Sequence, residues 1–330
     1  MKSMLKFLTA GLTLSFGMAF PAIAQDKINL RFGFETSIDS AQGVGAQEMV
    51  RVADKLSKGK ITFELFPDSK LGPGKKMAEM VQKGELDIFQ GGTGVFSAMD
   101  SRLNVFDIPY LFASVEQAYK VLDSKFGREM LASLEPHGFK GLSFWENGIR
   151  SITNNVRPIT KPEDLVGLKM RVPPNPVHLA MWKIFGTEPT TLTFGKIYEN
   201  LKNGTVDGQD HPIAPTYGGK FYEVQKYLSL TKHIYGPLIL VANLEKFKAM
   251  SKSHQEILLK AAHAGAVAQR KFSNENEARF IADMKAKGMQ VNEVDIKPFR
   301  DKVRPEIEKE FIAKNGDAWL KKINGLLKGK

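Results

Sequence analysis

The chain has 330 residues, 42% of them apolar and 25% charged, and contains no cysteine. This length suffices for two domains, the composition is that of a folded protein, and the missing cysteine excludes disulfides, iron–sulfur clusters and a cysteine nucleophile. The formal net charge is +11, but Lys and Arg never follow one another in runs longer than two, so we expect no nucleic-acid partner.

Residues 1–24 predict a secretory signal peptide. Lys2 and Lys6 supply the positive charge, the stretch from Phe7 to Phe20 is apolar and uncharged, and Ala22-Ile23-Ala24 fits a cleavage site. A retained membrane anchor is the alternative, but the apolar stretch is shorter than the ~20 residues that cross a bilayer. We therefore expect an exported protein that is cleaved near Ala24.

The first part of the remaining chain alternates short strands with amphipathic helices. Ile28, Leu30, Phe32 and Phe34 share one face of a segment with period two, which predicts a strand. Further patterns predict helices over 42–57 and 75–82 and strands over 61–66 and 86–89. This alternation indicates an α/β fold with a mainly parallel sheet.

The rest of the chain continues the alternation and then becomes helical. Extended segments are predicted over 141–145, 152–154, 168–172 and 237–241, and helices over 177–185, 194–202, 301–314 and 318–327. A capping box at Ser253 and Glu256 starts a helical pattern that runs almost to Lys287. Such a helix is longer than the roughly 8–20 residues that are usual in globular proteins, and it can lie across two domains. Because no flexible linker interrupts the chain, we expect crossing strands to join these domains.

Motifs of common enzyme and cofactor sites are missing from the sequence. It has no phosphate-binding loop, nucleophile elbow or zinc-binding helix motif, and its six histidines never pair at metal-ligand spacing. Gly91-Gly92-Thr93-Gly94 fits a tight turn better than a dinucleotide site. We therefore expect no cofactor, no metal and no enzymatic activity. An exported hydrolase or lyase is the alternative from a different class.

Arg171 is the most informative single residue. It lies near the end of a short apolar strand, just before Pro173 turns the chain. Burying an unpaired charge is costly, so such an arginine has either an internal ion-pair partner or an anionic ligand. Ligands bind at the carboxyl ends of strands in open α/β sheets, and the guanidinium fork fits a carboxylate.

Several segments together resemble the solute-binding proteins of tripartite ATP-independent periplasmic (TRAP) transporters. They are Leu-Phe-Pro-Asp-Ser-Lys-Leu-Gly at 65–72, Asp-Ile-Pro-Tyr-Leu-Phe at 107–112, Gly-Leu-Lys-Met-Arg-Val-Pro at 167–173, Phe-Gly-Lys-Ile-Tyr-Glu-Asn-Leu at 194–201 and Val-Asp-Gly-Gln-Asp-His-Pro at 206–212. The resemblance implies a two-lobed periplasmic-binding-protein-like α/β fold, with a ligand cleft between the lobes and a long domain-spanning helix. It also implies a monomeric periplasmic protein that captures a small carboxylate and delivers it to the small and large membrane subunits of a permease.

The resemblance also suggests how the lobes and the site are built. We expect lobe I to comprise 25–147 plus 237–276, and lobe II 148–236 plus 277–330. The implied ligand contacts are the main carboxylate-binding Arg171, the second arginine Arg150, the packing aromatic Phe194, and further Glu35, Gln90, Thr93, Trp145 and His211.

Two of these positions bear on the ligand. His211 stands where many members of the family carry Asn, and an imidazole there can donate to a carboxylate or hydroxyl and become charged at modest acidity. Glu35 would accept from hydroxyl groups and repel a second acid group. We therefore expect a hydroxylated sugar acid, with a C4-dicarboxylate or an aromatic or keto acid as alternatives.

Overall fold

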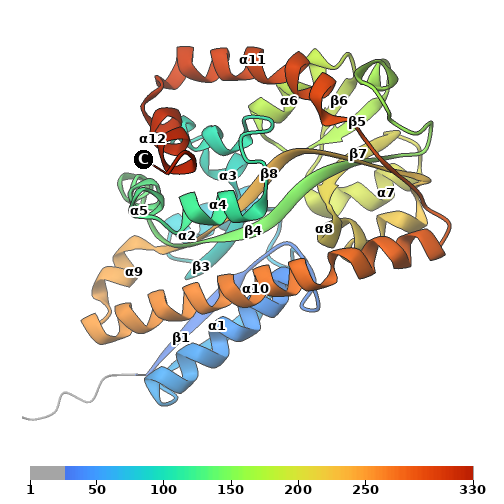
Figure 1. Cartoon of the computed structure of the whole chain (residues 1–330). Coiled ribbons are helices and arrows are strands. Elements are labelled where there is room, and N and C mark those ends of the chain that lie inside the picture. The colour runs from blue at the N-terminus through green and yellow to red at the C-terminus, as the bar shows by residue number, and fades with distance from the viewer. Residues whose placement is uncertain (1–26, 330) are drawn as a thin grey trace, which may run out of the picture.

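The computed structural model describes residues 27–329, so the predicted signal peptide, residues 1–24, lies outside the described residues. The described chain forms an α/β structure around one nine-stranded mixed sheet (Figure 1). The strands are β1 (Ile28–Gly33), β2 (Ile61–Phe66), β3 (Ile88–Gly92), β4 (Phe139–Asn154), β5 (Lys169–Val172), β6 (Glu188–Thr191), β7 (Gly208–Pro212), β8 (Tyr227–Asn243) and β9 (Gln290–Glu293). The α-helices are α1 (Ala41–Ser57), α2 (Gly74–Gln82), α3 (Thr93–Phe96), α4 (Val115–Leu122), α5 (Lys125–Ala132), α6 (Pro176–Ile184), α7 (Ile197–Lys202), α8 (Ile213–Gly218), α9 (Leu244–Ala249), α10 (Lys252–Ala286), α11 (Ile296–Asn315) and α12 (Ala318–Leu327).

The first strands and helices form because of local signals in the sequence. β1 pairs in parallel with β2, and its alternating residues Leu30 and Phe32 are buried. The Ser40 side chain accepts from the backbone N–H of Gly43 at 3.1 Å and so caps the start of α1. Lys58 ends that helix in the left-handed region, at φ 56°. The predicted alternation of strands and helices is confirmed.

Two long central strands, β8 and β4, connect the two halves of the sheet, β2-β1-β3 on one side and β7-β5-β6 on the other. The strand order is β2-β1-β3-β8-β4-β7-β5-β6, and β9 pairs with β8. β4 has 16 residues and β8 has 17, whereas the sequence predicted only short pieces of each. The reason is that β4 continues through register shifts, one of them between Glu146 and Gly148, where Gly148 has φ 114°. The bulges look like strand ends in the sequence, but the pairing continues across them.

The long helix α10 packs along both halves of the molecule. It has 35 residues and contacts α1, β4 and α8 (Figure 1). The predicted length is confirmed, but its cap is Ser251 and not Ser253, because the Ser251 side chain accepts from the backbone N–H of His254 at 3.2 Å. Gly265 lies so close to α1 that a Cβ there would come within 2.7 Å of the Gly45 carbonyl oxygen.

The largest hydrophobic core extends across the sheet from one half to the other. It includes Phe89 of β3, Phe144 of β4, Trp182 of α6 and Phe299 of α11. A second core lies where α1 and α10 cover β1, and contains Phe32 and Trp145. The two halves are therefore joined by shared apolar packing as well as by the central strands.

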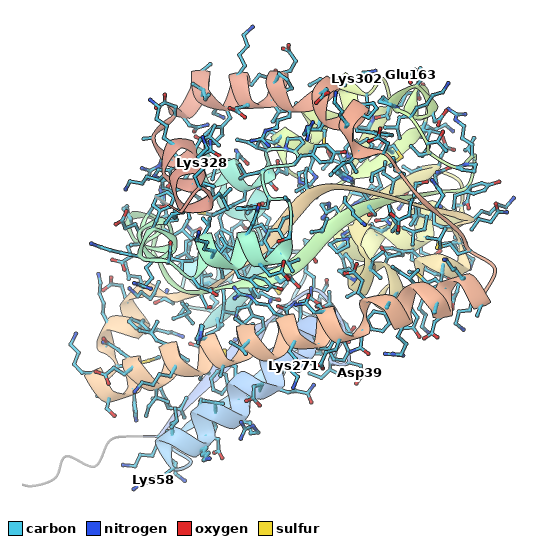
Figure 2. The ribbon with its side chains drawn as sticks, viewed as in Figure 1. Asp39, Lys58, Glu163, Lys271, Lys302 and Lys328 are labelled. Carbon is cyan, nitrogen blue, oxygen red and sulfur yellow. The ribbon has the colours of Figure 1, made fainter. Side chains whose placement is uncertain are left out.

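The exterior carries charges of both signs. Figure 2 shows examples on the outside of the molecule, the exposed Asp39, Lys58, Glu163, Lys271 and Lys302. Within 27–329, no helix combines the length and the apolarity that crossing a membrane requires.

Candidate functional site

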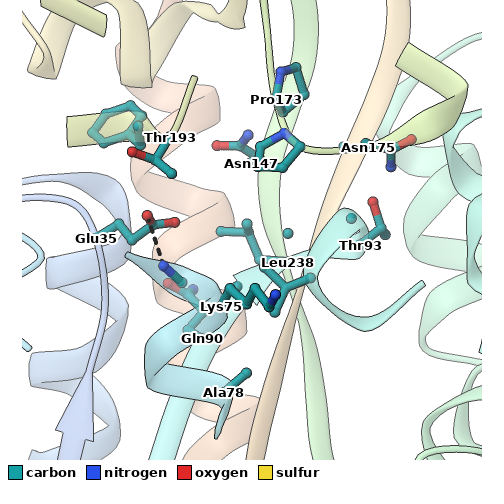
Figure 3. A pocket seen from close by; sticks show the side chains of 18 of the residues that line it. Glu35, Lys75, Ala78, Gln90, Thr93, Asn147, Pro173, Asn175, Thr193 and Leu238 are labelled. Atoms are coloured by element: carbon teal, nitrogen blue, oxygen red, sulfur yellow. Dashed lines mark hydrogen bonds between the residues drawn. The ribbon is translucent and has the colours of Figure 1, made fainter. Parts of the chain in front are cut away.

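A cavity of about 450 Å³ lies between the two halves of the molecule. Its walls come from the segments that follow β1, β3 and β5 and from the end of β7, in agreement with the rule that ligands bind at the carboxyl ends of strands. Figure 3 shows side chains from both halves around this space, with Glu35 and Gln90 on one side and Pro173, Thr193 and Asn175 on the other.

Arg171 is buried at the cavity and keeps part of its guanidinium unpaired. It lies on β5 opposite Gln209 of β7, and its exposed fraction is 2%. Its Nε and Nη2 donate to the carbonyl oxygen of Leu192 at 2.9 and 2.7 Å, while Nη1 has no hydrogen-bond partner among the described residues. No carboxylate of the described chain forms a salt bridge with it. Burial, together with the positive charge of Arg150, lowers the pKa of Arg171 to about 9, so the group stays cationic at neutral pH.

Arg150 is paired inside the protein. Its Nε donates to Asp210 Oδ2 at 2.6 Å, and its Nη2 donates to the Asp210 carbonyl oxygen. Burial by itself raises the pKa of Asp210, but the charge of Arg150 and the hydrogen bonds from His233 and Arg150 hold that pKa well below its usual range. Asp210 is therefore a carboxylate, and it leaves the charge of Arg171 for a ligand.

His211 lies beside these arginines. Its ring packs edge-on against Phe194, with centroids 5.5 Å apart, and its Nδ1 lies 2.5 Å from Gln209 Oε1. Burial, with the charges of Arg150 and Arg171, lowers the pKa of His211 well below its usual value. The structure thus corrects the expectation of an imidazole that becomes charged at modest acidity, because two neighbouring guanidinium groups disfavour the cation.

The wall of the cavity opposite Arg171 carries the polar side chains of Glu35 and Gln90. Glu35 Oε1 accepts from the backbone N–H of Gly74 at 3.2 Å. Burial raises the pKa of Glu35, and the Gly74 hydrogen bond and the charge of Arg171 only partly offset this. Gln90 is buried, and its Nε2 has no hydrogen-bond partner among the described residues. Gln90 can therefore donate to a ligand, and Glu35 can accept from one.

Asp107 joins residues from both sides of the cavity. Its exposed fraction is 2%, and it accepts from Thr93 Oγ1 at 2.8 Å and from Asn175 Nδ2 at 2.8 Å. His178 Nε2 lies 3.1 Å from its other oxygen. Thr93 begins α3, whereas Asn175 caps α6, so one carboxylate holds the starts of two helices together.

Seven of the eight predicted contact residues line the cavity, but Trp145 does not. The seven are Glu35, Gln90, Thr93, Arg150, Arg171, Phe194 and His211. Trp145 is fully buried, packs against Gly45 and Gly265, and donates from Nε1 to the Ala262 carbonyl oxygen at 3.0 Å. This position speaks against the expectation that Trp145 contacts the ligand, because α1 and α10 cover its ring.

Sequence reasoning did not single out Asp107, Asn147, Asn175 or His178, all of which line the cavity. Two signals were available. Asp107 opens the Asp-Ile-Pro-Tyr-Leu-Phe segment, and Asn175 directly precedes Pro176, which is typical of a helix start because Asn caps helices and Pro favours their first position.

Comparisons with known proteins agree with this geometry. Residues 32–314 match the family described as bacterial extracellular solute-binding protein, family 7. The 2,3-diketo-L-gulonate-binding periplasmic protein of Escherichia coli strain K12 is 37% identical over 309 residues, which cover 93% of this chain and 94% of that protein.

Solved structures show the same fold. A TRAP periplasmic solute-binding protein from Polaromonas sp. JS666, bound to D-erythronate, is 36% identical with a TM-score of 0.87, over 91% of this chain and 98% of the other. The sugar acid binding protein from Advenella mimigardefordensis, in complex with galactonate, is 31% identical with a TM-score of 0.88, over 92% of this chain and 99% of the other.

Proposed function

Because this chain belongs to family 7 of the bacterial extracellular solute-binding proteins, the binding proteins of TRAP transporters, we propose that it captures a hydroxylated sugar acid in the periplasm for a membrane permease. The observation that carries this proposal is the guanidinium of Arg171, which is buried at a cavity between two lobes and has no carboxylate partner in the described chain. An incoming carboxylate can accept from its free N–H groups and supply the missing charge.

Binding closes the two lobes around the ligand. Lobe I comprises 25–147 plus 237–276, and lobe II comprises 148–236 plus 277–330, so the chain crosses between them in β4, at the start of the apolar part of β8, and in α10. A ligand drives closure only if it binds the closed state more tightly than the open one. Arg150, Arg171, Phe194 and His211 supply contacts from lobe II, and Glu35, Gln90 and Thr93 supply those from lobe I.

The polar groups of lobe I favour hydroxyl groups on the ligand. Glu35 offers a partly buried acceptor and Gln90 a free donor, and a second carboxylate next to Glu35 would be repelled. The relatives bound to D-erythronate and galactonate support this ligand class. A C4-dicarboxylate, or an aromatic or keto acid against Phe194, is the second candidate for the same role.

The role that we propose is that of a binding protein rather than an enzyme. Its relatives are solute-binding transport proteins, and the guanidinium of Arg171 at the cavity can donate to a carboxylate. We place it in the periplasm as a monomer, with the small and large membrane subunits of a TRAP permease as its partners.

Calorimetry tests the role of Arg171. Removing one partner of a buried charge-assisted pair should weaken binding of D-erythronate or galactonate by about 30-fold or more in the Arg171→Ala variant. Arg51→Ala is the matched control, because this arginine is exposed on α1 and, within 27–329, forms its salt bridge with Glu48 alone. Unchanged affinity in Arg171→Ala would remove Arg171 from the site, and turnover of the acid by the wild-type protein would favour a hydrolase or lyase.

A further inference from the structure

We propose that His211 is a fixed hydrogen-bond acceptor, and that it selects ligands carrying a hydroxyl group close to the carboxylate bound by Arg171. The proposal rests on the proposed function and names the group of the ligand that His211 recognises, a hydroxyl near the carboxylate. It depends on the direction of each hydrogen bond in a buried row of side chains behind His211.

The row begins at backbone carbonyl groups, which can only accept. Gln225 Nε2 lies 3.2 Å from the Asp207 carbonyl oxygen and 3.1 Å from that of Val224, so the amide nitrogen must point there. The Gln225 Oε1 atom therefore accepts, and the hydroxyl of Thr153 donates to it at 2.8 Å. This orients the amide of Gln225 and uses the single proton of the Thr153 hydroxyl.

The next two bonds follow from the first. Since the Thr153 proton is used, its oxygen accepts from Gln209 Nε2 at 2.9 Å. Gln209 Oε1 then faces His211 Nδ1 and must accept, so Nδ1 carries the ring proton. The exposed fractions of Thr153 and Gln209 are both 0%, so water does not compete for these bonds.

A neutral ring with its proton on Nδ1 has a lone pair on Nε2. Burial of the ring and the charges of Arg150 and Arg171 beside it lower the pKa of His211 and keep it neutral, against the opposing charge of Asp210. No group of the described chain forms a hydrogen bond with Nε2, and the residue lines the cavity. Nε2 therefore accepts from a ligand and repels a carboxylate oxygen.

The sheet places this acceptor next to the carboxylate site. Arg171 pairs with Gln209 across β5 and β7, and Gln209 and His211 share one face because side chains alternate along a strand. A ligand carboxylate on Arg171 thus brings the first carbons of the chain to His211. A hydroxyl group there donates to Nε2, whereas a methylene or a second carboxylate does not.

The first experiment reads the ring proton directly and needs no ligand. Nitrogen-15 NMR of histidine-labelled protein, with His211→Phe to assign the signal, should show the proton on Nδ1 of a neutral ring at pH 7. In Thr153→Val the row is interrupted, and the signal should move toward the mixture of tautomers seen in free histidine. A proton on Nε2, or a charged ring, in the wild-type protein would overturn the proposal.

The second experiment compares D-erythronate with 4-hydroxybutanoate, which keeps the carboxylate and the terminal hydroxyl but lacks those between them. The dissociation constant of 4-hydroxybutanoate divided by that of D-erythronate should fall roughly tenfold in His211→Phe, because one hydrogen bond to D-erythronate is lost. Thr153→Val should reduce the ratio in the same direction. Thr187→Val, which removes another buried hydroxyl whose bond goes to the Trp182 carbonyl, should leave the ratio unchanged.

An unchanged ratio in His211→Phe would overturn the selection of a hydroxyl group. If the wild-type protein bound no organic acid at all, the proposed function would fail, while the NMR result would still decide the protonation of His211.

Discussion

Glu146 is a buried acid that forms no direct salt bridge with any residue of the described chain. It lies on β4 with an exposed fraction of 1% and accepts from the Tyr119 hydroxyl at 2.6 Å. Arg270 lies over the Tyr119 ring but pairs with Asp123 instead. Burial raises the pKa of Glu146 to about 7, although Tyr119 and Arg270 act in the opposite direction.

This pKa predicts that the protein loses stability as the pH rises through the weakly acidic range. Between pH 4.5 and 7 the unfolded chain releases the Glu146 proton while the folded chain keeps it, so the free energy of unfolding falls. The raised pKa corresponds to about 3 kcal/mol of unfolding free energy, and this contribution is fully lost above pH 7. Glu146→Gln keeps an acceptor for Tyr119 and removes this dependence.

Urea unfolding at pH 5 and pH 7.5 measures the effect. We expect the difference between the two pH values to be smaller in Glu146→Gln than in the wild type. Glu64→Gln, an exposed glutamate on β2, should behave like the wild type. Equal pH dependence in all three proteins would show that Glu146 is ionised alike in the folded and unfolded chains.

The residues of the site differ in how far the sequence reveals them. Arg171 could be predicted because a charged residue between apolar neighbours and a proline is unusual in a strand. Trp145 was misplaced because the sequence does not show that α1 and α10, which are distant along the chain, cover its ring. Asp107 was missed because its donors, Asn175 and Thr93, are distant in sequence or separated from it by a helix.

Among the elements, the contact between α1 and α10 depends on two glycines. A Cβ on Gly265 would come within 2.5 Å of the Trp145 ring and 2.7 Å of the Gly45 carbonyl oxygen. The backbone of α1 must move to admit it. We therefore expect Gly265→Ala to destabilise the protein by about 1–3 kcal/mol, the usual cost of overpacking.

Thermal unfolding of Gly265→Ala tests this contact, with Gly325→Ala as the control. Gly325 lies in α12 with open space around it, so alanine there should stabilise the protein slightly through its higher helix propensity. Opposite shifts in melting temperature are expected. A Gly265→Ala protein as stable as the wild type would mean that the two helices separate at little cost.

Local signals in the sequence predicted several helices close to their observed bounds. Residues 318–327 were predicted as a helix and form α12 with the same bounds, and α2 and α6 differ from the predicted ranges by one residue at each altered end. β6 and β9 were not predicted because each has only 4 residues with little buried surface, and pairing with β5 and β8 decides their conformation. The starts of α4 and α5 were missed although Ser114 and Ser124 cap them.

At the scale of the whole molecule, Asp107 connects the lobes next to the cavity. Its partners Thr93 and Asn175 belong to different lobes in the proposed division of the chain, and the rigid Pro173-Pro174 pair links Asn175 to the strand of Arg171. Asp107→Asn removes the charge and turns one acceptor into a donor that faces other donors. We expect the variant to widen the distribution of distances between the lobes.

The absence of cysteine from the sequence makes this distance measurable. Spin labels on Lys55→Cys in lobe I and Glu163→Cys in lobe II report it by pulsed electron paramagnetic resonance. Asp39→Asn, an exposed acid, serves as the control, and Asn175→Asp combined with Asp107→Asn should restore the narrower distribution. Identical distributions in Asp107→Asn and the wild type would show that this carboxylate does not hold the lobes together.

The interlaced path of the chain also has a consequence for biosynthesis. β3 borders β8 in the sheet, and α1 rests on α10, yet β8 and α10 are translated more than a hundred residues later. The nascent chain therefore exposes an unpaired strand edge and an uncovered apolar helix face until the ribosome has almost finished. We therefore expect the fold to be completed only when the last third of the chain is available.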